Sequence, residues 1–389
     1  MPRDEKNQNQ TTIQDRVRSL LRAARQTILP SAGTNGLTRR DVLVKGSTAL
    51  GAAAVGSTLP MAFPMPAIAQ KLFRVAMLLP SFDQQRWKDA DGAFFMKRAR
   101  ELGMDALPLQ SSNNDPVLQA NQVENLLNQQ IDGLVLVPVN VDAATASVLR
   151  CNEANVPVVS HNYIVPNAKL AGISARDGVE LGVKLGDAML QFAPKGNYII
   201  TKGDEATDIA RLKAEGGFKV LQPKIDSGEI KIVADQYMMA WSGDLARKQV
   251  EQALTANNND IAAVFTYCDC MAYGVIEALK AQGLNGKVPV SGEDGEPEML
   301  KAILRGDAHV TAWTKFDEMG TRSAELLFAA LSGTPANAPA SANNGAGEVP
   351  WFKISIVNVT KDGKAPHAIS VADFADQNPW WVNKGDLGL

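Results

Sequence analysis

IDGLVLVPVN, residues 131–140, is an apolar run that predicts a strand buried on both faces of a parallel sheet. It follows a predicted helix at 115–130, which begins with Asp115 as a cap and Pro116 at the first helical position. A second predicted helix, at 142–155, comes after it and carries Cys151, which we expect to be a small core residue. Together the three segments predict part of a parallel α/β sheet.

Strand and helix patterns alternate along most of the chain. The first series of predicted strands lies at 72–80, 105–110, 131–140 and 156–162. After a short strand at 171–174, a second series lies at 196–201, 230–237, 261–268, 288–294 and 309–314. Because helices separate these strands, we expect an α/β fold of two doubly wound, Rossmann-like lobes, joined by a hinge and divided by a cleft.

The expected domain division follows from this order. The N-terminal lobe is assigned residues 70–178 and 315–345, and the C-terminal lobe residues 179–314 and 346–375. Between and after them we expect a loop at 332–350, one strand at 351–360 and a surface-lying aromatic tail at 376–389.

The first 69 residues have the layout of a twin-arginine export signal. Arg39 and Arg40 precede a weakly apolar run at about 46–59, and a small-residue cleavage motif ends at Ala69. The run is shorter than the roughly 20 apolar residues of a membrane-spanning helix. We therefore expect cleavage near Ala69 and a mature protein that begins near Gln70 in the periplasm.

Composition narrows the class of protein. Hydrophobic residues make up 45% and charged residues 21% of the 389 residues, as in soluble globular proteins. A net charge of −3 without a basic stripe argues against nucleic acid or an acidic membrane as a partner. The sequence has no G-x-S-x-G, H-E-x-x-H or phosphate-loop motif, so neither catalysis nor a cofactor is expected.

The stretch VFTYCDCMAYG, residues 264–274, contains two of the three cysteines. A metal site, a redox pair, a nucleophile and an inert pocket wall are the alternatives. No histidine stands at zinc-ligand spacing from Cys268, and a disulfide from Cys268 to Cys270 is expected to be strained if both lie in a strand. The pocket wall is the favoured interpretation, and a cysteine enzyme that uses Cys268 with His161 is the alternative.

Ligands of open parallel sheets bind beyond the carboxyl ends of the strands. The residues expected there lie at 79–86, 140, 161–163, 202–211, 237–241, 268–269, 294 and 313–315. We therefore expect these segments to line the cleft between the lobes.

Several runs resemble the periplasmic sugar-binding proteins of ABC importers, of the ribose and xylose type and in particular their D-xylose-binding members. They include QRWKDADGAF (85–94), APKGNYIITKG (193–203), IEALKAQGLNGKVPVSGED (276–294) and NNGAGEVP (343–350), and the resemblance extends from about residue 73 to 359. It implies a type I periplasmic binding protein, without catalytic activity, whose lobes close over a sugar and then dock on a membrane permease. A monomer is expected.

The resemblance also implies a ligand site, with departures. Arg86, Trp241 and Asp294 match a family arginine, a stacking aromatic and a carboxylate, whereas Cys268 replaces a family asparagine and Thr314 a lysine. The full predicted ligand-binding set is Arg86, Trp87, His161, Asn162, Tyr163, Asp208, Arg211, Trp241, Cys268, Asp269, Asp294 and Thr314. Because an Asp-Arg pair of the family is also replaced here, by Asn162 and Tyr163, we expect a small carbohydrate or polyol other than D-xylose.

Two further function classes share this fold. A periplasmic sensor would present the closed form to a chemoreceptor or sensor kinase, and the sequence does not separate it from an importer component. Sugar-responsive transcription factors carry a helix-turn-helix at the N-terminus, where this chain carries the predicted export signal.

Overall fold

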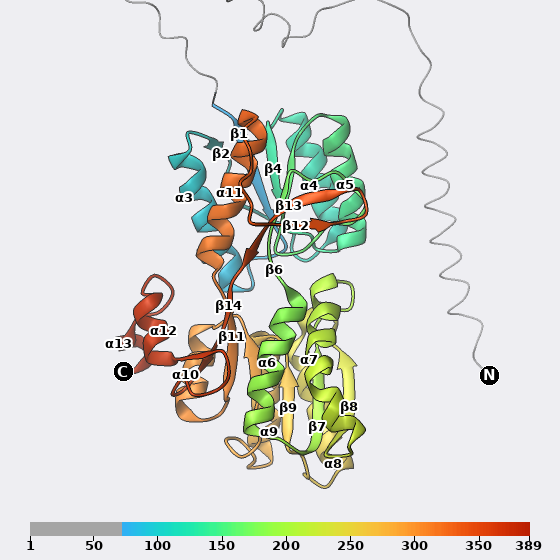
Figure 1. The fold of residues 1–389 in the computed structure, drawn as a ribbon, viewed down its shortest axis with the longest axis vertical. Helices are drawn as coiled ribbons and strands as arrows, with labels where there is room; N and C mark the ends of the chain where they lie inside the picture. The colour runs from blue at the N-terminus through green and yellow to red at the C-terminus, as the bar shows by residue number, and fades with distance from the viewer. Residues whose placement is uncertain (1–71) are drawn as a thin grey trace, which may run out of the picture. The chain divides into compact units, whose positions relative to one another are not determined.

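The computed structural model describes residues 72–389, so the predicted export signal lies outside the described residues. These residues form two α/β lobes, each with a central sheet between helices (Figure 1). No helix within 72–389 is both long enough and apolar enough to span a membrane. The α/β alternation predicted from the sequence is confirmed.

The first lobe is built on a sheet with the order β12-β13-β6-β5-β4-β1-β2, and β3 also pairs with β1. Its strands are β1 (Arg74–Leu79), β2 (Asp105–Ala106), β3 (Gln110–Ser111), β4 (Gly133–Leu136), β5 (Val158–His161), β6 (Gly172–Arg176), β12 (Ala340–Asn343) and β13 (Glu348–Ile354). Paired strands are parallel except β12 with β13. The run that predicted a buried strand forms β4, which is buried throughout.

Helices cover both faces of this first sheet. On one face lie α4 (Pro116–Asn128) and α5 (Val141–Glu153), which pack with Ala76 and Leu78 of β1. On the other lie α3 (Ala93–Glu101), which continues the π-helical turn η1 (Trp87–Gly92), and α11 (Phe316–Ser332). Because successive side chains of a strand point to opposite faces, the apolar β1 contributes to both cores.

The second lobe has two runs of strands, β8-β7-β9 and β10-β11-β14-β15, linked by a single bridge between Val264 and Val290. Its strands are β7 (Gly196–Lys202), β8 (Ile230–Tyr237), β9 (Ala263–Thr266), β10 (Ser291–Glu293), β11 (Val310–Thr314), β14 (Ile356–Thr360) and β15 (Ala368–Ser370). Its helices are α6 (Gly178–Phe192), α7 (Asp208–Asp226), η2 (Met239–Trp241), α8 (Gly243–Ala256), α9 (Asp269–Ala281), α10 (Pro297–Arg305), α12 (Val371–Gln377) and α13 (Lys384–Leu387). Among the strand pairs described in this lobe, β11 and β14 are antiparallel and the others are parallel.

The chain crosses between the lobes after β6, after β11 and at Ser355 between β13 and β14 (Figure 1). The predicted single strand at 351–360 is therefore two strands in different sheets. The predicted loop at 332–350 contains β12 and the start of β13. The expected lobe boundary at 345/346 falls too early, because β13 pairs with β6 in the first sheet.

The expectation that the aromatic tail lies on the surface is wrong for most of its apolar side chains. Trp381 is 6% exposed and belongs, with Val382 and Leu387, to the core of the second lobe. Trp380 is 37% exposed. These side chains are buried because removing apolar surface from water lowers the free energy of the folded protein.

Helices α6 and α7 of the second lobe pack closely through glycines. A Cβ added at Gly182 would lie 2.1 Å from the carbonyl oxygen of Lys213, and one at Gly216 would lie 2.1 Å from that of Val179. The two helices thus touch through their backbones, and this contact fixes where α7 places its side chains.

We expect Gly182→Ala to lower the free energy of unfolding by about 1–3 kcal/mol, because the added methyl group has no space without moving α7. Urea unfolding followed by circular dichroism measures this. Lys219→Ala, on the partner helix α7, is the control, because it removes only the exposed Lys219–Glu215 ion pair of 2.7 Å and should cost less than about 0.5 kcal/mol. Equal losses in the two variants would contradict the close-packing argument.

Candidate functional site

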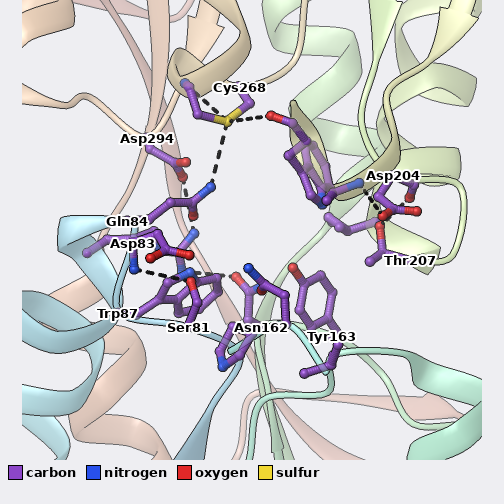
Figure 2. A pocket seen from close by; sticks show the side chains of 18 of the residues that line it. Ser81, Asp83, Gln84, Trp87, Asn162, Tyr163, Asp204, Thr207, Cys268 and Asp294 are labelled. Atoms are coloured by element: carbon purple, nitrogen blue, oxygen red, sulfur yellow. Dashed lines mark hydrogen bonds and ion pairs between the residues drawn. A yellow bond between two sulfur atoms is a disulfide. The ribbon is translucent and has the colours of Figure 1, made fainter. Parts of the chain in front are cut away.

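A cavity of about 280 Å³ lies between the two lobes, where strands of both sheets end (Figure 2). Seven predicted ligand-binding residues line it: Arg86, Trp87, Asn162, Tyr163, Trp241, Cys268 and Asp294. They come from loops that follow different strands, as expected for an α/β sheet. The strand-end argument thus located the cavity.

The guanidinium of Arg86 is the centre of the polar contacts in this cavity. Arg86 is 2% exposed and contacts Asp91 with two nitrogens, Nε at 3.0 Å from Oδ2 and Nη2 at 3.1 Å from Oδ1. Its Nη1 lies 3.1 Å from Oδ1 of Asp294, which belongs to the other lobe. Burial alone would lower the pKa of Arg86, but the two carboxylates hold it above its usual range. Arg86 therefore carries a permanent charge that joins the lobes.

His161 holds Asp91 in place from behind. Its Nε2 lies 2.7 Å from Asp91 Oδ1, and its Nδ1 lies 2.8 Å from the hydroxyl oxygen of Ser323. Burial lowers the pKa of His161 although Asp91 opposes the shift. The net lowering favours the neutral ring. A carboxylate only accepts, so Nε2 donates to Asp91 and Nδ1 accepts from Ser323. The prediction that His161 contacts ligand is therefore corrected, because it lies behind the cavity wall.

Asp294 is the carboxylate of the second lobe that faces this arginine. Burial and then the neighbouring Glu293 raise the pKa of Asp294 to about 7, although Arg86 opposes the shift. The backbone of Asp294 has φ 111°, a conformation that non-glycine residues rarely adopt. A carboxyl group with such a pKa accepts and donates hydrogen bonds with comparable ease near neutral pH.

A second buried ion cluster, which was not predicted, lies beside the first. Glu293 pairs with Arg176, whose Nη2 lies 2.6 Å from Oε1, and with the ammonium of Lys213. Burial opposes ionisation of Glu293, but Arg176 and Lys213 hold its pKa below the usual range. Arg176 stands at the end of β6, in the first sheet, so this cluster also connects the lobes.

Two buried donors of the cavity lining have no partner within residues 72–389. Asn162 uses its Oδ1 as acceptor for both Arg86, at 3.0 Å, and Arg176. Its Nδ2, and the Nε of Arg176, are buried and unpaired there. Unpaired buried donors of this kind cost free energy.

Trp241 forms an aromatic wall of the cavity. A Cβ on Gly203 would lie 2.1 Å from the indole ring, so only glycine permits this position of the ring. Lys213 Nζ lies 4.4 Å from the ring centroid. Ala240 and Trp241 both have positive φ, and Asp204 Oδ2 accepts from the backbone N–H of Ala240 at 2.6 Å. The hydrogen bond from Ala240 to Asp204 thus holds the turn that carries the indole.

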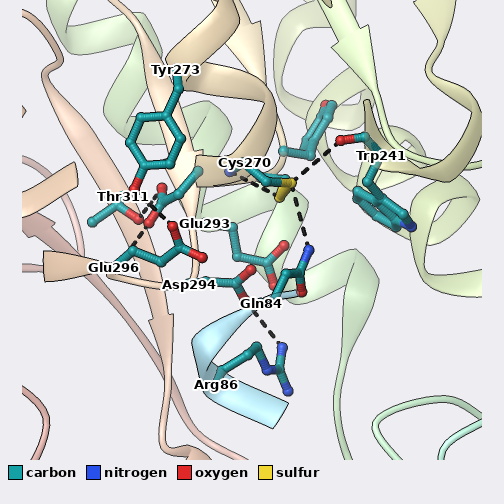
Figure 3. Close-up of a disulfide and its surroundings, with 12 residues drawn as sticks. Gln84, Arg86, Trp241, Cys270, Tyr273, Glu293, Asp294, Glu296 and Thr311 are labelled. Carbon is teal, nitrogen blue, oxygen red and sulfur yellow. Dashed lines mark hydrogen bonds and ion pairs between the residues drawn. A yellow bond between two sulfur atoms is a disulfide. The ribbon is translucent and has the colours of Figure 1, made fainter. Parts of the chain in front are cut away.

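Cys268 and Cys270 form a disulfide in the cavity wall (Figure 3). They do not share a strand, because Cys268 caps α9 and Cys270 lies in the first turn of that helix. The amide nitrogen of Gln84, from the first lobe, lies 3.6 Å from Cys270 Sγ. The expectation based on a common strand is thereby corrected, and the pair is an oxidised part of the pocket wall.

Asp208 and Arg211 do not line the cavity. Asp208 accepts from the backbone N–H of Ile164 in the first lobe at 3.3 Å. Arg211 is exposed and donates to the carbonyl oxygen of Glu205 at 2.6 Å. The helix α7 turns both side chains away from the cavity and brings Lys213 to it instead.

Asp269 and Thr314 are also outside the lining. Asp269 is fully buried and accepts from the Thr311 hydroxyl and from the backbone N–H of Glu296, both at 2.8 Å. Thr314 is fully buried at the end of β11. Both are corrected from predicted ligand contacts to parts of the second-lobe core.

The sequence reasoning missed Arg176, Lys213, Glu293 and Cys270 among the lining residues, whereas Gln84 lies in the segment 79–86 that was expected to line the cleft. Glu293 stands next to Asp294, and Arg176 ends a strand that was predicted to stop at 174, so a longer strand would have included it. No three or more His, Cys, Asp or Glu side chains within 72–389 are grouped so as to hold a metal ion.

The disulfide and the buried Cys151 make a thiol-labelling prediction. We expect no alkylation of the native protein by iodoacetamide, two modified cysteines after reduction under native conditions, and three after reduction in denaturant. Cys151 is fully buried, and burial raises the pKa of its thiol to about 12, which suppresses the reactive thiolate. Mass spectrometry of peptides assigns the labels. Labelling of Cys268 or Cys270 without reductant would show that the disulfide is absent.

The periplasmic binding protein domain family matches residues 75–335. The chain is 33% identical over 293 residues to the D-xylose-binding periplasmic protein of Escherichia coli (strain K12), covering 75% of this chain and 88% of that protein. It is 32% identical over 292 residues to the D-xylose-binding periplasmic protein of Haemophilus influenzae, covering 75% and 87%.

Solved structures agree on the fold. An ABC transporter solute-binding protein from Clostridium phytofermentans with bound β-D-glucose has a TM-score of 0.71 at 21% identity, covering 81% of this chain and 99% of that one. The resemblance inferred from the sequence is confirmed: the chain belongs to the periplasmic binding protein family and has its type I fold.

Proposed function

We propose that this chain is the solute-binding component of an ABC importer, which captures a small carbohydrate or polyol and delivers it to an inner-membrane permease. One observation carries the proposal: Arg86, Asp294 and Trp241, from both lobes, converge on one cavity. Guanidinium and carboxylate groups form strong hydrogen bonds with hydroxyls. An indole face covers the C–H side of a sugar ring.

The size and the polarity of the cavity define the ligand class. Its volume of about 280 Å³ is near the lower end of the roughly 300–1,000 Å³ of small-molecule sites, which suits a single ring or a short polyol. We also propose that hydroxyl oxygens of the ligand become acceptors for the donors of Asn162 and Arg176 that have no partner within 72–389. Because Cys268 is locked in a disulfide and offers no amide, we propose a ligand other than D-xylose.

Capture would proceed by hinge closure. The ligand contacts groups of both lobes, and only the closed form makes all these contacts at once, so binding energy favours closure. Three crossing segments act as the hinge, after β6, after β11 and at Ser355. We propose a monomer that works in the periplasm after cleavage near Ala69.

The alternative functions have less support. A cysteine enzyme would need Cys268 as nucleophile and His161 as base, but Cys268 is disulfide-bonded and His161 is hydrogen-bonded to Asp91 and Ser323. A sensor would use the same cavity. The D-xylose-binding relatives and the ABC transporter protein with bound glucose favour import over the sensor.

A thermal-shift panel tests the proposed ligand class. We expect at least one of the pentoses, hexoses, tetritols and inositols to raise the melting temperature, because bound ligand stabilises by roughly 2.7 kcal/mol at a hundredfold excess over Kd. D-xylose should shift it less than the best ligand does. If no sugar or polyol shifts the melting temperature, the carbohydrate proposal fails.

Substitutions separate the cavity seen in the structure from the site implied by the resemblance alone. We expect Arg86→Lys to weaken binding of the best panel ligand about tenfold to a hundredfold, because a buried partner of Arg86 loses its hydrogen bond. Arg211→Ala should leave affinity unchanged, since this arginine is exposed and turned away from the cavity. Isothermal titration measures both. A loss with Arg211→Ala and none with Arg86→Lys would reject this cavity as the site.

The pKa of Asp294 predicts a pH dependence of binding. Ligand hydroxyls that donate to Asp294 favour its ionised form, so affinity should increase as the pH rises through about 7. In the unliganded protein the sign is opposite: a raised folded-state pKa gives stability that is lost as the pH rises through the same value. Titrations across this range measure the first effect, and Asp294→Asn should remove the slope. A slope that persists in Asp294→Asn would assign it to another group.

A further inference from the structure

The C-terminal segment packs directly behind the carboxylate of the cavity. The indole N–H of Trp381 donates to the carbonyl oxygen of Gly295 at 2.7 Å, and Gly295 follows Asp294 in the chain. A Cβ on Gly295 would lie 2.8 Å from the ring of Trp313 and 3.5 Å from that of Phe374 in α12. Rings of the C-terminal segment and of β11 therefore enclose this turn.

The turn at Asp294 and Gly295 has an unusual backbone. Both residues have positive φ, 111° and 61°. Such conformations cost about 1–3 kcal/mol at non-glycine residues and persist only where surrounding contacts hold them. The contacts here are few: Asp294 N–H donates to Ala312 O at 2.9 Å, Gly295 N–H to the Thr311 hydroxyl at 3.1 Å, and Trp381 to Gly295 O. Trp381 therefore supplies one of the three hydrogen bonds that hold the backbone of Asp294 and Gly295, and this backbone sets the direction from which the carboxylate reaches Arg86.

The neighbouring tryptophan contacts the opposite lobe. Trp380 packs edge-on against Phe94, with ring centroids 4.7 Å apart. Phe94 lies in α3, which continues η1, and Arg86 stands immediately before η1. Trp380 and Trp381 thus contact the supports of both partners of the Arg86–Asp294 pair. Their own ring centroids lie 5.9 Å apart, with the ring planes tilted by 59°.

We propose that Trp380 and Trp381 are positioning residues of the ligand site. Trp381 holds the turn so that Asp294 faces Arg86 and the ligand, and Trp380 fastens the same segment to the helix that supports Arg86. The effect on ligand rests on the proposed function, whereas the effect on the turn does not. The C-terminal segment is then a working part of the cleft and not an appended tail.

Hydrogen exchange of the ligand-free full-length protein tests the effect on the turn. Trp381→Phe keeps an aromatic ring but removes the N–H donor, so we expect the backbone amides of residues 294–296 to exchange about tenfold faster than in the wild type. Lys384→Ala is the matched control, because it removes only an exposed ion pair with Asp376 in the same segment, 2.8 Å long. It should leave exchange at 294–296 unchanged.

Affinity tests the effect on the ligand, with D-xylose, D-glucose, erythritol and myo-inositol as probes. For any probe that binds the wild type, Trp381→Phe should weaken binding about tenfold. Trp380→Ala, at a partly exposed site, should weaken it less and should speed dissociation, whereas Lys384→Ala should change neither. These measurements use isothermal titration and stopped-flow fluorescence.

The outcomes separate the two proposals. Unchanged exchange at 294–296 in Trp381→Phe, or faster exchange spread evenly over the second lobe, would overturn the positioning role. Faster local exchange with unchanged affinity would also overturn it, because the turn would then not determine binding. If no probe binds the wild type, the proposed function loses its support, and exchange at the turn still decides the role of Trp381 in holding Asp294.

Discussion

The ion pair between Arg86 and Asp294 is the constraint on which the cavity depends. It places two charges from different lobes in a buried site, where each isolated charge would cost several kcal/mol. The surroundings therefore supply partners: Asp91 binds Arg86 with both oxygens, and His161 fixes Asp91 in turn. The cost of burying Asp294 is limited in another way. Its pKa is raised to about 7, so the carboxylate can take up a proton near neutral pH and lose its charge. Much of the polar structure around the cleft can be understood as compensation for this one contact.

The sequence predicted the fold well where hydrophobic periodicity is strong. The apolar β4, with the capped helix before it, follows directly from residues 115–140. The prediction failed at the edge of the first sheet, since β12 is only four residues long, ASAN, and contains no large apolar residue, so it resembles a loop. It also failed at Ser355, because β13 and β14 are both strands and nothing in a continuous strand pattern marks a crossing between lobes.

The site was predicted in part, for a geometric reason. The rule that ligands bind beyond strand ends identified Arg86, Trp241 and Asp294, but it does not say which way a strand-end side chain points. Asp269 and Thr314 follow or end strands and yet turn into the core. The Glu293 cluster could not be predicted, because Arg176 and Lys213 are distant in sequence and come together only through the packing of α6 on α7 and the crossing after β6.

In the hinge closure that we propose, the cross-lobe contacts also determine how strongly a ligand must bind in order to close the lobes. Arg86–Asp294 and Arg176–Glu293 both connect the lobes, but buried ion pairs gain little net free energy because their desolvation offsets the attraction. These pairs therefore select the geometry of closure without greatly stabilising it. The donors of Asn162 and Arg176 that have no partner within 72–389 oppose closure until acceptor atoms meet them. A ligand needs about 5.5 kcal/mol of differential affinity to change a 1:99 equilibrium to 99:1. In the proposed closure this comes from simultaneous contacts with Arg86 of the first lobe and with Asp294 and Trp241 of the second, because only the closed form offers them together.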